Sequence, residues 1–179
     1  RSNPVRTALL LPWLLVGSAL NAARPAEAWS LNCLLVPLTF LSSESRRAHV
    51  DAEFVASFRG HLHAHPRVRA RLEEHPAQGS AVFIVSGSPE SLVRAVYPEL
   101  ASRTGVQILG STMRRGPHAT CLLDRCIGEG KRRMLEQRFG EGIRFECGYG
   151  DSESDAPVFA LCSRAFRVTR RGDIVSRDD

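Results

Sequence analysis

The amino-acid sequence predicts an α/β fold with a parallel central sheet and a helical segment ahead of it. Two apolar runs, Ser80–Val85 and Ile143–Cys147, indicate the sheet. Each has the continuous apolar character of a buried parallel strand and ends in a glycine-containing turn. The segments before residue 77 are instead apolar runs or have helical spacing. A chain of 179 residues suits one domain with a small insert. We therefore expect a helical segment over residues 1–76 and a core over residues 77–179.

Two apolar runs open the helical segment, at residues 8–20 and 31–41. Each is shorter than the ~20 apolar residues that a membrane-spanning helix needs. We expect both runs to form buried helices. The alternative is that they contact a bilayer surface, with Trp13 and Trp29 in or beside them.

Residues 43–62 have the spacing of an amphipathic helix, on which Val50, Phe54 and Phe58 recur at helical intervals. A shorter helix is expected over residues 66–75, and it is followed by a turn that ends at Gly79.

The run 80–85 leads into a turn of small residues and then a predicted helix. Ser88 is a good N-cap, and Pro89 then occupies the favoured first helical position. A strand, a small-residue turn and a helix N-terminus can bind phosphate through free backbone N–H groups. Ser86, at the tip of the strand, would add a hydroxyl. The alternative is an ordinary connection between strand and helix.

Residues 106–114 and 120–127 predict an antiparallel hairpin, and the helix that follows opens with Lys131 in its first turn. A cation at this end of a helix does not stabilise the helix dipole, but it is well placed to meet an anion. A final strand or hairpin is expected over residues 165–169 and 173–175.

Two carboxylates, Asp151 and Asp155, follow the apolar run that ends at Cys147. Carboxylates delivered to the carboxyl edge of a parallel sheet suit Mg2+, which prefers oxygen ligands. The alternative is structural, since Ser152-x-x-Asp155 is also the pattern of a capping box for a helix that residues Ala156 to Cys162 would continue.

Composition limits the partners. The formal net charge is +5, but the arginines are scattered and only 7% of the residues are aromatic, so we do not expect a nucleic-acid partner. Lys131 is the only lysine, and its ammonium is a compact point charge that arginine does not reproduce. The five cysteines are odd in number and lack Cys-x-x-Cys spacing, which favours a reducing compartment over a disulfide framework or a zinc site.

These features follow one another in a definite order: a hydroxyl after a strand, a lone lysine opening a helix, and two carboxylates after a later strand. In this order they resemble motifs two, three and four of the haloacid dehalogenase-like phosphatase superfamily. The chain is similar in particular to the bacterial phosphatidylglycerophosphatase C group. Val85–Tyr97 resembles its motif two, Gly148–Pro157 its motif four, and Phe166–Gly172 its tail.

The resemblance implies a three-layer Rossmann-like core, a helical cap inserted after the first strand, and Mg2+-dependent hydrolysis of a phosphomonoester. Ser86, Gly87 and Ser88 would bind the phosphoryl oxygens. Lys131 would neutralise charge on the nucleophile and on the transferred group. Asp151 would bind Mg2+, and Asp155 would hold that site directly or through water.

The sequence departs from the family pattern at one point. The family's nucleophile and its acid/base are the two aspartates of an Asp-x-Asp motif on the first strand, and this chain contains no Asp-x-Asp. Asp51-Ala-Glu53 lies inside the predicted amphipathic helix. Because the phospho-enzyme route needs a carboxylate nucleophile, we expect the chain alone to be an inactive, N-terminally truncated copy. A non-catalytic homologue is the alternative.

For the complete protein, the resemblance implies dephosphorylation of phosphatidylglycerophosphate to phosphatidylglycerol, with peripheral membrane contact through the apolar cap. The expected location is the cytoplasm, at the cytoplasmic face of the inner membrane if the cap meets lipid. Two alternatives remain open: a soluble small-molecule phosphatase similar to phosphoserine phosphatase, and a non-catalytic remnant that binds phosphate or Mg2+.

Overall fold

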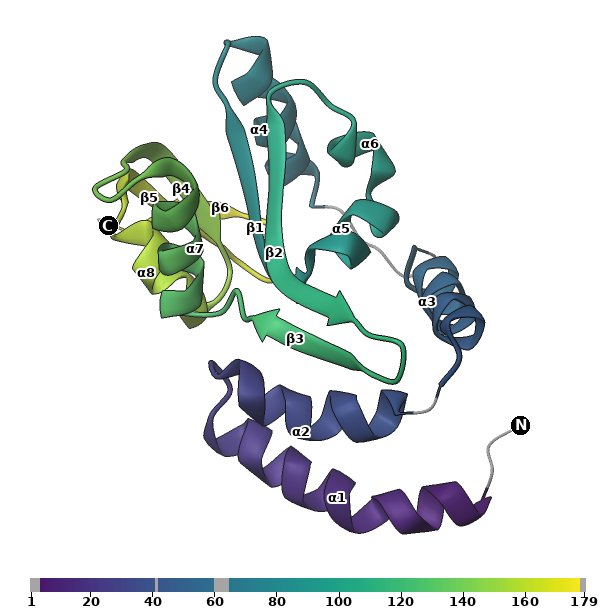
Figure 1. Cartoon of the computed structure of the whole chain (residues 1–179). Coiled ribbons are helices and arrows are strands. Elements are labelled where there is room, and N and C mark those ends of the chain that lie inside the picture. The colour runs from purple at the N-terminus through teal and green to yellow at the C-terminus, as the bar shows by residue number, and fades with distance from the viewer. Residues whose placement is uncertain (1–3, 41, 60–64, 178–179) are drawn as a thin grey trace.

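The computed structural model describes residues 4–40, 42–59 and 65–177, and Figure 1 shows the course of the chain. Before the first strand all the regular elements are helices. They are α1 (Pro4–Ala23), α2 (Ala28–Thr39), α3 (Glu44–Arg59) and α4 (Pro66–Ala77). The remaining elements are β1 (Val82–Pro89), α5 (Glu90–Val96), α6 (Pro98–Ala101), β2 (Val106–Arg115), β3 (Thr120–Asp124), α7 (Glu129–Phe139), β4 (Phe145–Gly150), a 3-10 turn (Glu153–Asp155), α8 (Ala156–Phe159), β5 (Cys162–Val168) and β6 (Ile174–Ser176).

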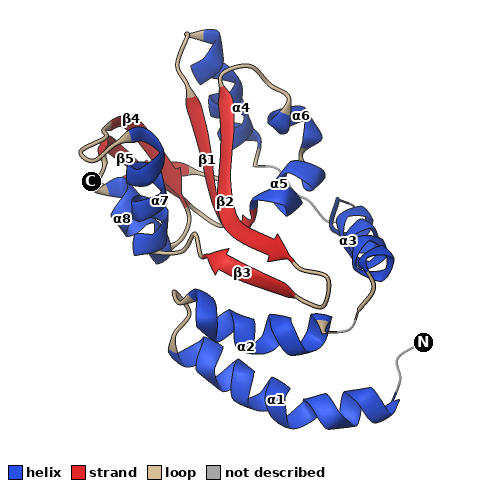
Figure 2. Ribbon diagram, in the orientation of Figure 1, coloured by secondary structure: helices blue, strands red, loops and turns tan. Residues whose placement is uncertain are grey.

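The strands form two three-stranded sheets, with the orders β1-β2-β3 and β4-β5-β6. In each sheet the first pair is parallel and the second is antiparallel. Figure 2 shows α5 and α6 beside the first sheet, α7 and α8 beside the second, and α1 and α2 stacked below β3. The predicted α/β class is therefore confirmed. One parallel pair lies in each of the two sheets, which we call the half-sheets β1-β2-β3 and β4-β5-β6.

Several predicted elements are confirmed and some boundaries were wrong. The hairpin through Gly116, the helix that Lys131 opens and the last hairpin are all present. The helix expected over residues 43–62 is α3, and the last residues of that range lie outside the described part of the chain. The boundary at residues 76 and 77 between cap and core stays a prediction.

The start of α5 differs from the prediction. Strand β1 continues through Ser88 to Pro89, and the helix begins at Glu90. Pro89 therefore occupies the N-cap position, where no side chain caps the helix. The pairing of β1 with β2 shifts register between Ser86 and Pro89, so these residues form an irregular extended stretch rather than a tight turn.

The hydrophobic core joins the two half-sheets. Leu109 of β2, Leu135 of α7 and Leu161 before β5 are buried against one another. Partly buried side chains from both sheets and from α7 pack around them: Phe83, Val85, Phe139, Ile143, Phe145 and Val158. The core thus depends on α7, whose side chains pack against residues of both half-sheets.

Helix α2 covers the outer edge of β3. The side chain of Asn32 accepts from the backbone N–H of Leu122 at 2.7 Å and donates to its carbonyl at 2.8 Å. Thr39 accepts from the N–H of Thr120 at 2.8 Å. These side chains pair with backbone groups that an edge strand otherwise leaves open.

Helices α1, α2 and α3 all leave apolar side chains at the surface. On α3, Phe54 and Phe58 stack with ring centroids 5.6 Å apart and remain about half-exposed. On α1, Trp13 is 64% exposed. None of the described helices combines the length and apolar character that crossing a membrane requires.

Arg47 joins α3 to the β2–β3 hairpin and is buried. Its guanidinium donates to the carbonyl oxygens of Ser42 and Gly116, the latter at 3.0 Å, while its Nε has no partner within the described residues. A buried cation held by two carbonyls fixes the position of α3 against the core.

We therefore expect Arg47→Ala to lower the free energy of unfolding by about 1–3 kcal/mol, because both carbonyls lose a charged donor. Arg46→Ala is the matched control, since that neighbouring side chain is exposed and should change stability by less than about 0.5 kcal/mol. Urea denaturation followed by circular dichroism measures both. Equal effects of the two substitutions would contradict the anchoring role of Arg47.

Candidate active site

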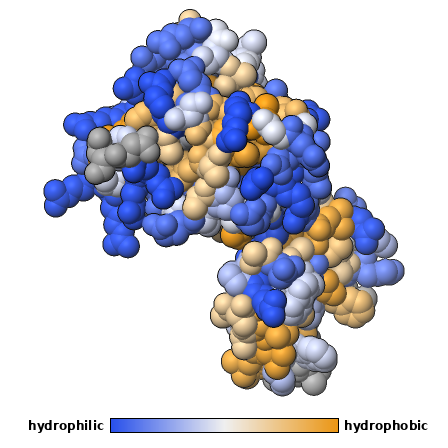
Figure 3. Space-filling model, turned by 90° about the vertical axis from the view of Figure 1, so that its left-hand side faces the viewer, coloured by the Kyte–Doolittle hydropathy of each residue, from blue (hydrophilic) through white to orange (hydrophobic). Residues whose placement is uncertain are grey.

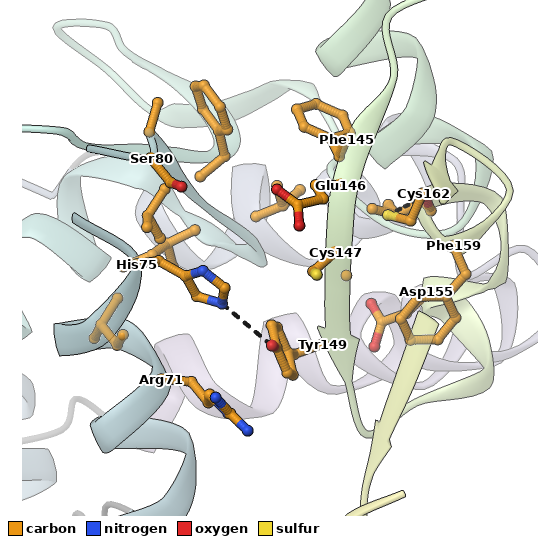
Figure 4. Close-up of a pocket in the computed structure, with 18 of the residues that line it drawn as sticks. Arg71, His75, Ser80, Phe145, Glu146, Cys147, Tyr149, Asp155, Phe159 and Cys162 are labelled. Atoms are coloured by element: carbon orange, nitrogen blue, oxygen red, sulfur yellow. Dashed lines mark hydrogen bonds between the residues drawn. The ribbon is translucent and has the colours of Figure 1, made fainter. Parts of the chain in front are cut away.

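A cavity of about 470 Å³ lies between the two half-sheets, and we call it the inter-sheet cleft. Its walls include the consecutive residues 80–85, which lead into and form β1, and Phe145–Tyr149 of β4 (Figure 4). Successive side chains of a strand point to opposite faces of the sheet, so walls made of consecutive residues are strand edges rather than one face. Within the described residues, β1 is hydrogen-bonded only to β2 and β4 only to β5.

Contacts with α7 show that β1 and β4 run in the same direction. Phe139, at the end of α7, lies 4.6 Å from Phe83 between ring centroids, and Phe83 lies 5.5 Å from Phe145 at the start of β4. At the other end, Lys131 in the first turn of α7 pairs with Asp155, which follows β4. The carboxyl ends of both strands therefore meet near the first turn of α7.

Lys131 is a largely buried cation in the wall of the cleft. Lys131 as a whole is 8% exposed. Its ammonium forms an ion pair with Asp155, and the exposed fractions of the two side chains are 10% for Lys131 and 14% for Asp155. Two glycines allow the backbone conformation at the start of α7. Gly128 has a φ of 56°, which favours glycine, and a Cβ on Gly130 would lie 2.1 Å from the carbonyl oxygen of Arg125. The sequence therefore brings the only lysine of the chain into the wall of the cavity.

The capping box predicted for Asp155 is confirmed. The N–H of Ser152 donates to Asp155 Oδ2 at 3.2 Å, and the hydroxyl of Ser152 accepts from the N–H of Ser154 at 3.2 Å. Asp155 Oδ1 accepts from Lys131, so both carboxylate oxygens have partners. A Cβ on Gly150 would lie 2.6 Å from Oδ2, and only glycine leaves room for this arrangement.

Asp151 lies apart from the ion pair. Its side chain is exposed and borders a separate hollow of about 40 Å³, which Arg167 and Arg177 also line. Its carboxylate makes no hydrogen bond or ion pair with any residue that the structure describes. Both oxygens therefore remain available to a ligand.

Ser86 lies at the point where β1 becomes irregular, and it does not line the inter-sheet cleft. Its hydroxyl accepts from the N–H of Ser88 at 3.2 Å. Opposite it, a Cβ on Gly110 would lie 2.6 Å from the carbonyl oxygen of Ser88, so β2 approaches this stretch closely. Gly87 lies near Ile127, just before α7, which brings the 86–88 stretch to the same end of the cleft as Lys131.

Mg2+ fits the candidate residues in part. Among the residues that the structure describes, no three His, Cys, Asp or Glu side chains converge on one point. Mg2+ does not require such a cluster, because it commonly binds one or two protein carboxylates and completes its shell with water and substrate phosphate. Asp151 has the free oxygens for this role, whereas Asp155 is better placed to hold Lys131 and the 151–155 loop.

Four further residues of the site were not found from the sequence: Arg71, His75, Ser111 and Tyr149. His75 Nε2 lies 3.2 Å from the Tyr149 hydroxyl across the cleft, and Figure 4 shows Arg71 beside them. Burial raises the pKa of Tyr149. The buried Ser111 hydroxyl donates to the Gly87 carbonyl at 2.7 Å and accepts from the Cys126 N–H at 3.0 Å. Only Arg71 and His75 share a sequence signal, because they lie four residues apart on α4.

The chain matches the family of haloacid dehalogenase-like hydrolases over residues 3–160. It belongs to this family. No solved structure matches the chain significantly. The membership supports a hydrolase with phosphatase-type chemistry, and the positions of Lys131, Asp151 and Asp155 around one end of the half-sheets agree with that chemistry.

The Lys131–Asp155 pair can be tested by a double-mutant cycle. We expect Lys131→Met or Asp155→Asn alone to lower the free energy of unfolding by about 3 kcal/mol, because each leaves a largely buried group without its partner. The double variant should lose less than the sum of the two single effects.

The exposed pair of Arg164 and Glu146, whose side chains are 59% and 76% exposed, serves as the control. Arg164→Ala should cost less than about 1 kcal/mol. Additive effects of Lys131→Met and Asp155→Asn would show that the two groups do not interact in solution.

Proposed function

We propose that this chain is the phosphate- and metal-binding part of a Mg2+-dependent phosphomonoesterase, and that an additional β-strand in the inter-sheet cleft carries the nucleophile. The observation that carries the proposal is the Lys131–Asp155 ion pair in the wall of a cavity bordered by two strand edges. A lysine held in this position offsets negative charge on an incoming carboxylate and on a phosphoryl group.

The shape of the cleft supports a strand as its occupant. A strand inserted between β1 and β4, about 4.8 Å from each neighbour, would hydrogen-bond to both edges and join the half-sheets into one sheet. Because β1 and β4 run in the same direction, a parallel strand would bring its carboxyl end toward Lys131. A strand buried on both faces is expected to be apolar, which agrees with the apolar walls that Phe83, Val85 and Phe145 provide.

The proposed reaction divides between this strand and the described residues. One carboxylate of the strand would attack phosphorus in line with the ester oxygen, which leaves with a proton from the strand's second carboxyl group. That second carboxylate would then take a proton from the water that attacks the aspartyl phosphate, which releases inorganic phosphate and frees the first carboxylate. The Ser86 hydroxyl and the N–H group of Gly87 would bind the phosphoryl oxygens, and the Ser88 N–H would hold the Ser86 hydroxyl through the bond that it donates to it. Lys131 neutralises the carboxylate and the transferred group, and Asp155 keeps the lysine oriented through their ion pair.

Asp151 would hold Mg2+ together with the nucleophile carboxylate and a phosphoryl oxygen. When bound, the metal supplies charge neutralisation where negative charge accumulates in phosphoryl transfer. The capping box positions Asp151 indirectly, because Ser152 and Asp155 fix the loop that begins at Asp151.

We propose phosphatidylglycerophosphate as the substrate. The likeness of the 85–97, 148–157 and 166–172 segments to the phosphatidylglycerophosphatase C group supports this choice. The exposed apolar surface of α1 also supports it, since a lipid substrate must be met at a membrane.

The strand proposal predicts that activity can be restored. We expect no hydrolysis of p-nitrophenyl phosphate by the chain alone in Mg2+, and measurable hydrolysis when it is co-expressed with a strand of five apolar residues followed by Asp-Leu-Asp. The same strand with Asn-Leu-Asn should give none. In the active pair, Asp151→Asn and Lys131→Met should each lower kcat about 100-fold or more, because each removes charge stabilisation of the transition state.

Occupation of the cleft can be measured without activity. The Cys147 thiol lines the cleft, whereas Cys121 lies on β3 away from it. Bound strand should slow alkylation of Cys147 and leave Cys121 unchanged. Protection of Cys147 without turnover would favour the non-catalytic, phosphate- or Mg2+-binding alternative, and absence of both effects would contradict a strand site in the cleft.

The substrate is tested on the restored protein. We expect kcat/KM for phosphatidylglycerophosphate in mixed micelles to exceed that for phosphoserine and other soluble phosphomonoesters. The reverse order would instead favour a soluble phosphatase similar to phosphoserine phosphatase.

A further inference from the structure

The last two strands of the second half-sheet carry an excess of arginine. Residues 162–177 include five arginines and one acidic residue, Asp173. Figure 3 views the molecule from the side of this half-sheet and shows hydrophilic residues gathered over much of the upper lobe. Two of the arginines, Arg167 and Arg177, line the small hollow that Asp151 also borders. This hollow holds basic side chains that the proposed reaction does not use.

Strand pairing brings both arginines to the carboxyl end of β4. Arg167 of β5 is in register with Gly150, the last residue of β4. Arg177 follows β6, and its backbone N–H donates to the carbonyl oxygen of Ala165 on β5 at 3.0 Å. The two guanidinium groups therefore reach the hollow from neighbouring strands, beside the loop that begins at Asp151.

Phe159 positions Arg177 and connects the hollow with the inter-sheet cleft. The guanidinium carbon of Arg177 lies 4.9 Å from the centroid of the Phe159 ring, which is a favourable cation–π distance. The ring attracts the cation without being an oxygen acceptor, so the N–H donors of Arg177 remain available to an anion. Phe159 also lines the cleft, so the hollow and the cleft share one wall.

Neither arginine is closely paired with a carboxylate of the residues that the structure describes. Arg167 lies 3.9 Å from Glu153, which is beyond hydrogen-bond length, and the Glu153 side chain is 85% exposed. Arg177 forms no ion pair within the described part of the chain. Arg164, on the same strand as Arg167, instead lies 2.7 Å from Glu146. The donors of Arg167 and Arg177 are therefore open to a ligand.

The charge of the hollow depends on whether Asp151 holds a metal ion. The carboxylates of Asp151 and Glu153 balance the two guanidinium groups, so these four side chains have no net formal charge. Mg2+ bound at Asp151 adds two positive charges and makes the hollow attractive to an anion. Arginine binds phosphate through paired N–H···O bonds. With a volume of about 40 Å³, the hollow suits one group of a ligand rather than a whole molecule.

We propose that Arg167 and Arg177 bind a second phosphate group of the substrate, a phosphodiester, beside the phosphomonoester that is hydrolysed. This subsite rests on the proposed function and narrows its substrate class to phosphomonoesters that carry a neighbouring phosphodiester. Phosphatidylglycerophosphate has this pattern, because a glycerol unit joins its two phosphates. The second phosphate binds together with Mg2+, since only the metal leaves the hollow with net positive charge.

Binding to the full chain tests the subsite without turnover. Glycerophosphoglycerol phosphate is a soluble head group with both phosphates, whereas glycerol 3-phosphate has the phosphomonoester alone. In Mg2+, isothermal titration calorimetry should give a dissociation constant about tenfold lower for the first compound, because charge-assisted hydrogen bonds to the arginines are strong. Omitting Mg2+ should abolish most of this difference, because the carboxylates of the hollow then offset its arginines.

Arg167→Gln combined with Arg177→Gln should bring the two dissociation constants within about twofold of each other, because the second phosphate loses its charged donors. The matched control is Arg164→Gln, which should keep the difference. Its side chain is 59% exposed, against 63% for Arg167, and it does not line the hollow. Because all three side chains are exposed, the circular dichroism spectra and the urea midpoints should stay close to those of the unaltered chain.

Several results would overturn the subsite while the phosphatase proposal stands. They are equal binding of the two compounds, a difference that the double variant keeps or that Arg164→Gln removes equally, and a difference that does not depend on Mg2+. Tighter binding of phosphoserine than of glycerophosphoglycerol phosphate would also overturn it, because the second anion would then be a carboxylate.

Two further results separate the subsite from the proposed function. Absence of binding by either phosphate compound would contradict both, since the phosphomonoester site would also be missing. A preference that the double variant removes, in a chain that gains no activity with the added strand, would support the subsite and contradict the catalytic role.

Discussion

The two half-sheets are held together along α7, and the candidate site depends on that helix. At its carboxyl end, Phe139 packs on Phe83, which in turn contacts Phe145 of the other sheet. At its amino end, Lys131 pairs with Asp155. The apolar contact sets the separation of the strands at one end of the cleft, while the ion pair holds the reactive end. A change in the tilt of α7 would alter the cavity and the position of its only lysine together.

Strand edges leave backbone N–H and carbonyl groups without partners. This applies both to the outer edge of β3 and to the edges of β1 and β4 that border the cleft. At β3, the side chains of Asn32 and Thr39 supply those partners. At β1 and β4, the edges face a cavity of about 470 Å³ instead. The strand that we propose for this cavity would satisfy both rows of N–H and carbonyl groups, as Asn32 and Thr39 do in part at β3.

Local sequence signals predicted the parts of this structure that local interactions determine. The apolar β-branched run through Ile84, the hairpin through Gly116 and the capping box of Ser152 and Asp155 each follow from neighbouring residues, and all three are present. The pairing of Lys131 with Asp155 spans 24 positions, but their order along the chain and the scarcity of lysine made both residues candidates.

Features that depend on distant residues were not predictable in the same way. The division into two half-sheets depends on which strands pair over long sequence distances, and no local pattern encodes that. The approach of His75 to Tyr149 joins residues 74 positions apart. The start of α5 moved to Glu90 because pairing of Pro89 with Ser111 of β2 extends the strand, so a tertiary contact overrode the capping signal of Ser88.

The capping box also indicates which carboxylate of the 151–155 loop is structural and which is available to a metal ion. A single side chain seldom serves as both a fixed structural acceptor and a freely adjustable metal ligand. Asp155 has each of its oxygens engaged, one by Ser152 and one by Lys131. Asp151, one residue before the cap, has its oxygens open and lies on a backbone that the cap holds in place. The structural and the metal-binding interpretations of this loop are therefore compatible, because they apply to different aspartates.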